Sequence, residues 1–133
     1  MIDIENKIID TLDAALPGVT VYSTFELVPE EFPCVMVDYD YAGDLVKTFD
    51  NQLSPHHASI SVQVDSFALS KNEAKQINAS VVDTMHNMKF TCTESFFFGT
   101  YAEGIHRCTA RFTAIVGEGE TDEETTTYRM YRR

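Results

Sequence analysis

The chain has 133 residues, of which 44% are hydrophobic and 23% charged, a balance typical of one soluble globular domain and too small for two separate cores. Its formal net charge of −11 disfavours general binding of nucleic acid by phosphate neutralisation. No apolar run approaches the roughly 20 residues that span a bilayer, and no secretory-type start is recognisable, so we expect neither a membrane protein nor a secreted one.

The first residues predict an amphipathic helix and then a short strand. Ile4, Ile8 and Leu12 recur at helical spacing, which predicts a helix over residues 3–16 with Asp3 as its N-cap. Pro17 and Gly18 end this helix. A short strand is expected over residues 19–22, and the acidic stretch 23–32 predicts a surface loop.

The next stretch predicts a strand followed by a long loop. Residues 33–41 begin apolar on both faces and then alternate, as in a strand that emerges from the interior. Residues 42–55 show no sustained period, which predicts a loop of about 14 residues, longer than most connections in compact domains. We expect it to be an assembly element, with four candidate contact residues: Asp44, Leu45, Lys47 and Phe49.

The middle of the chain carries the clearest periodic signals. Apolar and polar residues alternate over 58–65, which predicts a half-buried strand. A helix over about 71–88 is predicted next, because apolar residues recur at spacings of three and four and Ser70 with Glu73 forms a capping box. The Thr- and Phe-rich stretch 91–98 predicts another strand.

After a predicted turn over 99–104, residues 106–116 form the last strong strand. Arg107 and Arg111 fall on its polar face, while Cys108, Ala110 and Phe112 face the other way. Residues 117–124 predict a charged, flexible segment, either an exposed loop or the base of an arm, and residues 125–133 predict an edge strand or an arm that awaits a partner. We therefore expect one domain over 1–116, with an acidic loop and C-terminal arm over 117–133.

The order of elements predicts an α+β domain, in which a mainly antiparallel sheet has two amphipathic helices packed on one face. If the strands on either side of the second helix are parallel, their crossover should be right-handed. The predicted core is Ile8, Leu12, Val35, Val37, Ile60, Val62, Val64, Ile77, Val81, Met85, Phe112 and Ala114.

The sequence contains no recognisable enzyme motif. There is no P-loop, no G-x-G-x-x-G, no G-x-S-x-G and no H-E-x-x-H, so we expect no catalytic residue, no cofactor and no metal site. The three cysteines are widely spaced and are interpreted as reduced core residues. The sequence leaves open another class of function, in which the chain is a small enzyme or ligand-binding module that uses His106 or Cys108 in a pocket.

The charges are segregated along the chain, although scattered solvated charge would explain the same residues. Opposite patches on one chain favour head-to-tail contacts between copies, which close into a ring if the rotation permits. The alternative role for these side chains is to line a channel. The candidate interface or channel residues are Arg107, Arg111, Glu118, Glu120, Arg129, Arg132 and Arg133.

Several stretches together resemble one known family. They are the N-terminal helix, the strand after Pro17-Gly18, the segments 31–37 and 60–64, the helix that opens at Ser70, and the strand 107–115. Over residues 1–116 the chain resembles the tail-terminator, or tail-completion, proteins of long-tailed bacteriophages. Residues 117–133 match no pattern of that family.

The resemblance implies a structural virion protein that is made in the cytoplasm of the host bacterium and located in the phage tail. It implies a ring of copies, commonly a hexamer, that caps the tail tube and provides the surface on which the head docks. The implied partners are further copies of the chain, the tail-tube protein and head-tail connector proteins, with DNA only passing through a channel. A head-tail connector, a neck adaptor or a minor tail protein would have similar size and character.

Overall fold

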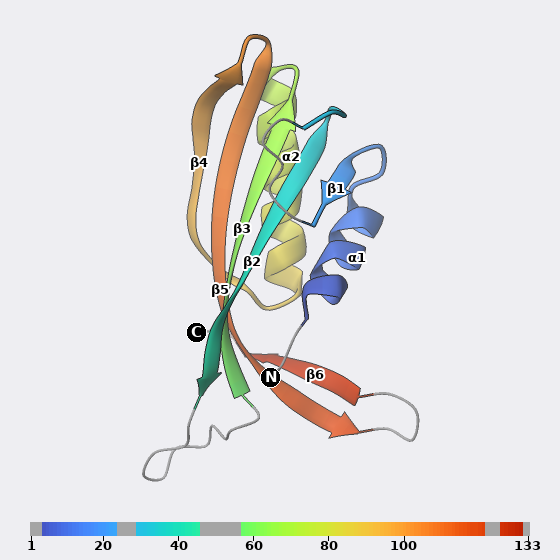
Figure 1. Ribbon diagram of the computed structural model, residues 1–133, viewed down its shortest axis with the longest axis vertical. Helices are drawn as coiled ribbons and strands as arrows, with labels where there is room; N and C mark the ends of the chain where they lie inside the picture. The colour runs from blue at the N-terminus through green and yellow to red at the C-terminus, as the bar shows by residue number, and fades with distance from the viewer. Residues whose placement is uncertain (1–3, 24–28, 46–56, 122–125, 132–133) are drawn as a thin grey trace.

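The computed structural model describes residues 4–23, 29–45, 57–121 and 126–131. The elements are α1 (Glu5–Ala15), β1 (Thr20–Tyr22), β2 (Cys34–Leu45), β3 (His57–Ala68), α2 (Lys71–Asn87), β4 (Thr91–Ala102), β5 (Ile105–Thr121) and β6 (Thr126–Tyr131). Both helices lie behind the sheet in Figure 1, so one sheet face is covered and the other is open. This arrangement confirms the predicted α+β fold.

The six strands form a single sheet in the order β1-β2-β3-β5-β4, with β6 also paired to β5. Only β1 and β2 pair in parallel; the other neighbours are antiparallel. Consequently β3 and β4 run in the same direction with β5 between them. Gly117 of β5 pairs with His57 of β3 and with Arg129 of β6, so β6 lies on the edge of β5 that β4 occupies farther along.

Helix α2 begins as its sequence predicts. The Ser70 hydroxyl accepts a hydrogen bond from the Glu73 N–H over 3.1 Å, which satisfies one of the free amides of the first turn. Its apolar face buries Ala74, Ile77, Val81 and Met85 against the sheet.

Helix α1 differs from its prediction at the start. It begins at Glu5 with Ile4 as the N-cap residue, and no side chain caps it. The predicted N-cap, Asp3, lies outside the described residues. The Ile4 and Ile8 side chains are buried, so burial of apolar residues rather than a cap fixes this end of the helix.

All twelve predicted core residues are buried, because the alternation on the strands and the three-to-four spacing on the helices were both in the correct phase. The core also contains two large residues that the prediction missed, Phe67 and Phe90. Neither α1 nor α2, the two helices of the described chain, has the length and apolar content needed to cross a membrane.

Four strands are longer than predicted, and the simplest case is β3, which extends the predicted 58–65 to His57–Ala68. The predicted loop over 42–55 is wrong at its start, because β2 continues to Leu45, which pairs with His57 of β3. Of the two predictions for residues 117–124, the exposed loop is wrong as far as Thr121, because β5 continues and pairs with β6. The other prediction, the base of an arm, agrees with this pairing. The predicted turn over 99–104 is reduced to its last residues, because β4 runs to Ala102 through an irregularity at Gly99, where φ is +127°.

These extensions give the molecule two arms. Figure 1 shows the C-terminal end of β2 with the start of β3, and the end of β5 with β6, running past the ends of both helices. Strand β5 therefore passes through Val116, the expected end of the domain, without a break. Residues 126–131 form an edge strand, one of the two possibilities that the sequence left open.

Candidate functional site

The open face of the sheet carries the candidate site. Strand pairing aligns its residues in rows that cross the sheet from β2 to β4. One row contains Met36, Asp65, Thr109 and Phe96. The next contains Asp38, Gln63, Arg111 and Glu94, and the third contains Asp40, Ser61, Thr113 and Thr91.

A buried ion pair lies at the first row. Asp65 is 0% exposed although no helix covers it, and its carboxylate accepts hydrogen bonds from Arg107 Nη2 at 2.8 Å and from Thr109 Oγ1 at 2.7 Å. Gln63 Nε2 adds a weaker contact at 3.3 Å. The Arg107 side chain is 19% exposed, so both charges are largely removed from water and hold β3 against β5.

Aromatic rings enclose this ion pair. The Arg107 guanidinium carbon lies 4.2 Å from the centroid of the Phe98 ring and 5.8 Å from that of Phe67. Phe67 belongs to a small apolar cluster on the open face with Cys34 and Met36. Phe98 is 57% exposed and Phe96 beside it 39%, with ring centroids 6.1 Å apart, so this end of the open face presents aromatic surface to solvent.

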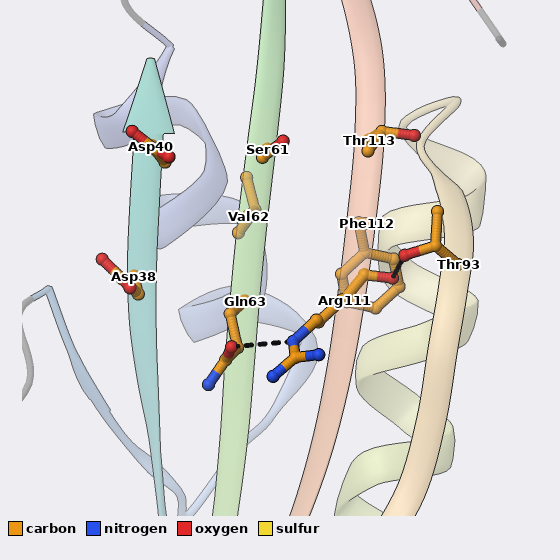
Figure 2. Close-up of a pocket in the computed structure, with 9 residues that line it drawn as sticks. All are labelled: Asp38, Asp40, Ser61, Val62, Gln63, Thr93, Arg111, Phe112 and Thr113. Atoms are coloured by element: carbon orange, nitrogen blue, oxygen red, sulfur yellow. Dashed lines mark hydrogen bonds between the residues drawn. The ribbon is translucent and has the colours of Figure 1, made fainter. Parts of the chain in front are cut away.

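Arg111 makes a second, more exposed set of contacts. Its Nη1 lies 2.6 Å from Glu94 Oε2, and its Nε donates to Gln63 Oε1 over 3.0 Å. Figure 2 shows the Arg111 side chain reaching from β5 toward Gln63 on β3. About half of each side chain of the Arg111–Glu94 pair is exposed, so water screens the attraction.

A hollow of about 220 Å³ lies beside Arg111 on the open face. Figure 2 shows two strands contributing to one wall, with Asp38 and Asp40 on β2 next to Gln63 and Ser61 on β3. Both aspartates are exposed, and neither has a hydrogen bond or an ion pair within the described residues. Thr113 and the paired Arg111 close the other side, so the charge in the hollow that has no partner among the described residues is negative.

The structure brings two of the predicted interface residues together, and both already have partners within the chain. Arg107 and Arg111 share the open face, as the alternation predicts, but they pair with Asp65 and Glu94. Each of these two guanidinium groups is therefore already paired within the chain, and the side chain of Arg111 is still half exposed on the open face.

The other predicted interface and loop residues are placed by their backbone or lie outside the described chain. Glu118 and Glu120 belong to β5 and Arg129 to β6. Asp44 and Leu45 belong to β2, so they form part of an arm rather than of a loop. The residues outside the described chain are Lys47, Phe49, Arg132 and Arg133.

The pair considered for catalysis, His106 and Cys108, lies on the helix-covered face of β5. Cys108 is 1% exposed, and burial raises the pKa of its thiol, an effect that the positive charge of Lys75 partly offsets. His106 Nδ1 is buried and has no hydrogen-bond partner within the described residues. A buried, protonated thiol is a poor nucleophile, so this geometry does not favour a catalytic Cys-His pair.

The interpretation of all three cysteines as reduced core residues is wrong for one of them. No disulfide joins them, and Cys34 and Cys108 are buried, but Cys92 on edge strand β4 is exposed. Its sulfur lies 3.4 Å from the Glu94 carbonyl oxygen. Within the ranges that the structure describes, no three His, Cys, Asp or Glu side chains come together as metal ligands.

The sequence missed the residues that organise the open face. Asp65 follows the alternating strand pattern of an exposed residue, and only the alignment of β3 with β5 brings Arg107 and Thr109 to it. Two neighbouring aromatic positions on one face of an edge strand, Phe96 and Phe98, were a usable signal for exposed apolar surface. No protein-family model matches the chain, and no curated protein is significantly similar to it.

Proposed function

We propose that this chain is a structural virion protein that oligomerises into a ring at the end of a phage tail tube and offers a docking surface to the head. The observation that carries the proposal is the pair of arms. The β2–β3 end and the β5–β6 end run past both helices (Figure 1), so no helix of the described chain covers them. Beyond Gly117, β5 pairs with β6 alone among the described strands. A two-stranded ribbon is marginally stable in water, and contact with a neighbouring copy would stabilise this one.

The edge strands and exposed rings support the same proposal. Strand β6 pairs with β5 alone, so among the described strands its other edge has no partner and can accept one from another copy. Phe96 and Phe98 add apolar surface on β4, the other strand at this side of the sheet. Aromatic side chains are enriched where proteins associate.

A head-tail connector, a neck adaptor or a minor tail protein would use the same arms, so the choice rests on the partner. A terminator binds the end of the tail-tube protein, whereas a connector binds the head side of the joint. The alternative from another class, a small enzyme at His106 and Cys108, is favoured less because the thiol is buried and protonated.

The mass of the purified protein in solution tests the proposal, with electron microscopy to identify rings. A matched pair of variants then tests the arms. Replacing residues 46–56 by a two-residue turn shortens the connection between β2 and β3, while replacing Glu103-Gly104 alters the β4–β5 turn away from the arms. We expect the first variant to fold without completing tails and the second to complete them. Normal virion yield from the first variant would exclude this arm from assembly.

A further inference from the structure

Strand β2 has a long edge that no described strand covers. One side of β2 pairs with β3 from Cys34 to Leu45, but the other side pairs with β1 only at Cys34, Val35 and Met36. After Met36, no described strand lies along this outer side. Such an edge presents a row of backbone N–H and C=O groups that can pair with an added strand.

The edge of β2 is more regular than that of β4, the outer strand at the other side of the sheet. The pairing of β4 with β5 is interrupted by three register shifts, and irregularities of this kind hinder the addition of a further strand. The pairing of β2 with β3 has no shift between Cys34 and Tyr41. Residues 37–41 therefore form a regular edge along which a strand can align.

Two carboxylates lie beside this edge. Asp38 and Asp40 are exposed on the open face, two residues apart, and neither has a hydrogen bond or an ion pair within the described chain. In a strand added at the edge, the residues opposite them would have Cβ atoms about 5 Å from those of the aspartates. Opposite charges at such positions stabilise strand pairing and like charges destabilise it. The edge therefore disfavours an acidic strand and favours one with basic residues at alternate positions.

The hollow beside the aspartates gives room for long basic side chains. It has a volume of about 220 Å³ and lies on the β3 side of Asp38 and Asp40 (Figure 2). The aliphatic part of a lysine or arginine can lie across β2 while its charged end reaches the carboxylates. Arg111 on the far side of the hollow is already paired with Glu94, which reduces its repulsion of a further cation.

The helix-covered face of β2 defines the other half of the pattern. Val37 is buried there and Tyr39 is half-buried, with its hydroxyl accepting a hydrogen bond from the Ile4 N–H over 3.3 Å. Because side chains alternate between faces, a strand with basic residues beside Asp38 and Asp40 would place its other residues beside Val37 and Tyr39. Small apolar residues suit those positions.

We propose that the outer edge of β2 over residues 37–41 binds an extended segment of another protein by strand addition. Asp38 and Asp40 select a segment in which basic and apolar residues alternate. The edge and the carboxylates belong to a single chain, so this site goes beyond the proposed ring and does not depend on it. If the aspartates served only to keep the edge solvated, no strand would bind there.

The probe is a fluorescently labelled peptide in which lysine and valine alternate. A control peptide of the same composition has its lysines grouped at one end, so it carries the same charge without the pattern. Fluorescence anisotropy measures the binding of each peptide to the full chain and to two variants with equal changes in charge. The test variant is Asp38→Asn with Asp40→Asn. The control variant is Asp10→Asn with Asp13→Asn, because both of these aspartates are exposed on α1, behind the sheet.

We expect the alternating peptide to bind the parent chain at least about fivefold more tightly than the test variant, with the control variant close to the parent. The grouped peptide should bind the parent chain more weakly, and the alternating peptide should slow amide hydrogen exchange over β2.

Equal losses of affinity in the two variants, or equal affinities of the two peptides, would overturn the proposal, because general attraction to an acidic chain would then explain the binding. Absence of binding would also overturn it. In that case, amide exchange over β2 that slows as the protein concentration rises would identify a second copy at the edge.

Discussion

Arg107 on β5 donates from Nη2 to Oδ2 of Asp65 on β3 over 2.8 Å, and this ion pair is buried on a sheet face that no helix of the described chain covers. The rings of Phe98 and Phe67 lie within cation–π distance of the guanidinium, and Thr109 supplies a further hydrogen bond to the carboxylate. Neither charge has full access to water, so each charged group is stabilised in the folded protein by its partner.

Replacing Asp65 by Ala should therefore destabilise the protein strongly. The substitution leaves the Arg107 charge largely buried without its carboxylate, which costs about 3 kcal/mol of unfolding free energy or more. Denaturant unfolding measures the loss. The matched control is Asp38→Ala on the same face, which removes an exposed carboxylate with no ion pair among the described residues and should change stability by less than about 0.5 kcal/mol. Equal losses for the two variants would mean that the ion pair does not hold β3 against β5.

The packing of α2 against the core gives a second prediction. Ile77→Ala removes a buried side chain that packs in the main core, so it should cost about 2 to 4 kcal/mol through lost transfer energy and a residual cavity. Ser80→Ala on the exposed side of the same helix is the control and should be close to neutral. If Ile77→Ala melts like the parent protein, α2 is packed in a different phase from the one described.

The main elements could be predicted because their signals are local. The Ser70 cap, the three-to-four spacing in α2 and the alternation over 58–65 each depend on neighbouring residues in the sequence, and each is confirmed. The extensions of β2 and β5 could not be predicted, since Gly43 and Gly117 have poor strand propensity and are held by pairing with β3 and β6.

The same difference between local signals and long-range pairing explains which parts of the candidate site could be predicted. Alternation correctly placed Arg107 and Arg111 on one face, but their partners come from β3 and β4 and depend on strand register. The buried state of Asp65 likewise depends on residues more than forty positions away in the sequence. Periodicity specifies a face, whereas the partners on that face follow from the sheet order.

The pH dependence of stability tests the environment of Cys34. Burial, with a smaller contribution from the negative charge of Glu31, raises the pKa of the Cys34 thiol from its ordinary 9.0 to about 12. Above pH 9 the unfolded chain loses this proton while the folded chain keeps it. Stability should therefore be complete below pH 9 and should fall as the pH rises toward 12, by roughly 1.4 kcal/mol per pH unit from this group.

The comparison for this prediction is the slope of unfolding free energy against pH in Cys34→Ala. The variant loses a buried side chain and starts from a lower stability, but its decline above pH 9 should be shallower than in the parent protein. Parallel slopes would show that the Cys34 thiol ionises as readily in the folded chain as in the unfolded one.

The exposed aromatic surface gives the prediction closest to assembly. Phe98→Ser removes a ring that is 57% exposed, so it should weaken association between copies while changing the melting temperature little. Leu69→Ser is the control, because Leu69 is 63% exposed and lies after β3, outside the aromatic surface. Sedimentation velocity at equal concentrations compares the two. A control variant that dissociates as readily as Phe98→Ser would remove the aromatic surface from the interface.

The most direct test of the proposed ring is the molar mass of the unmodified protein, measured by light scattering during size-exclusion chromatography. One chain has a mass of 15.0 kDa. A closed ring predicts a single species at a whole-number multiple of that mass, commonly sixfold for the family that the sequence resembles, with ring-shaped particles in the same fraction by electron microscopy. A species of one chain mass at every concentration up to the solubility limit would contradict the account.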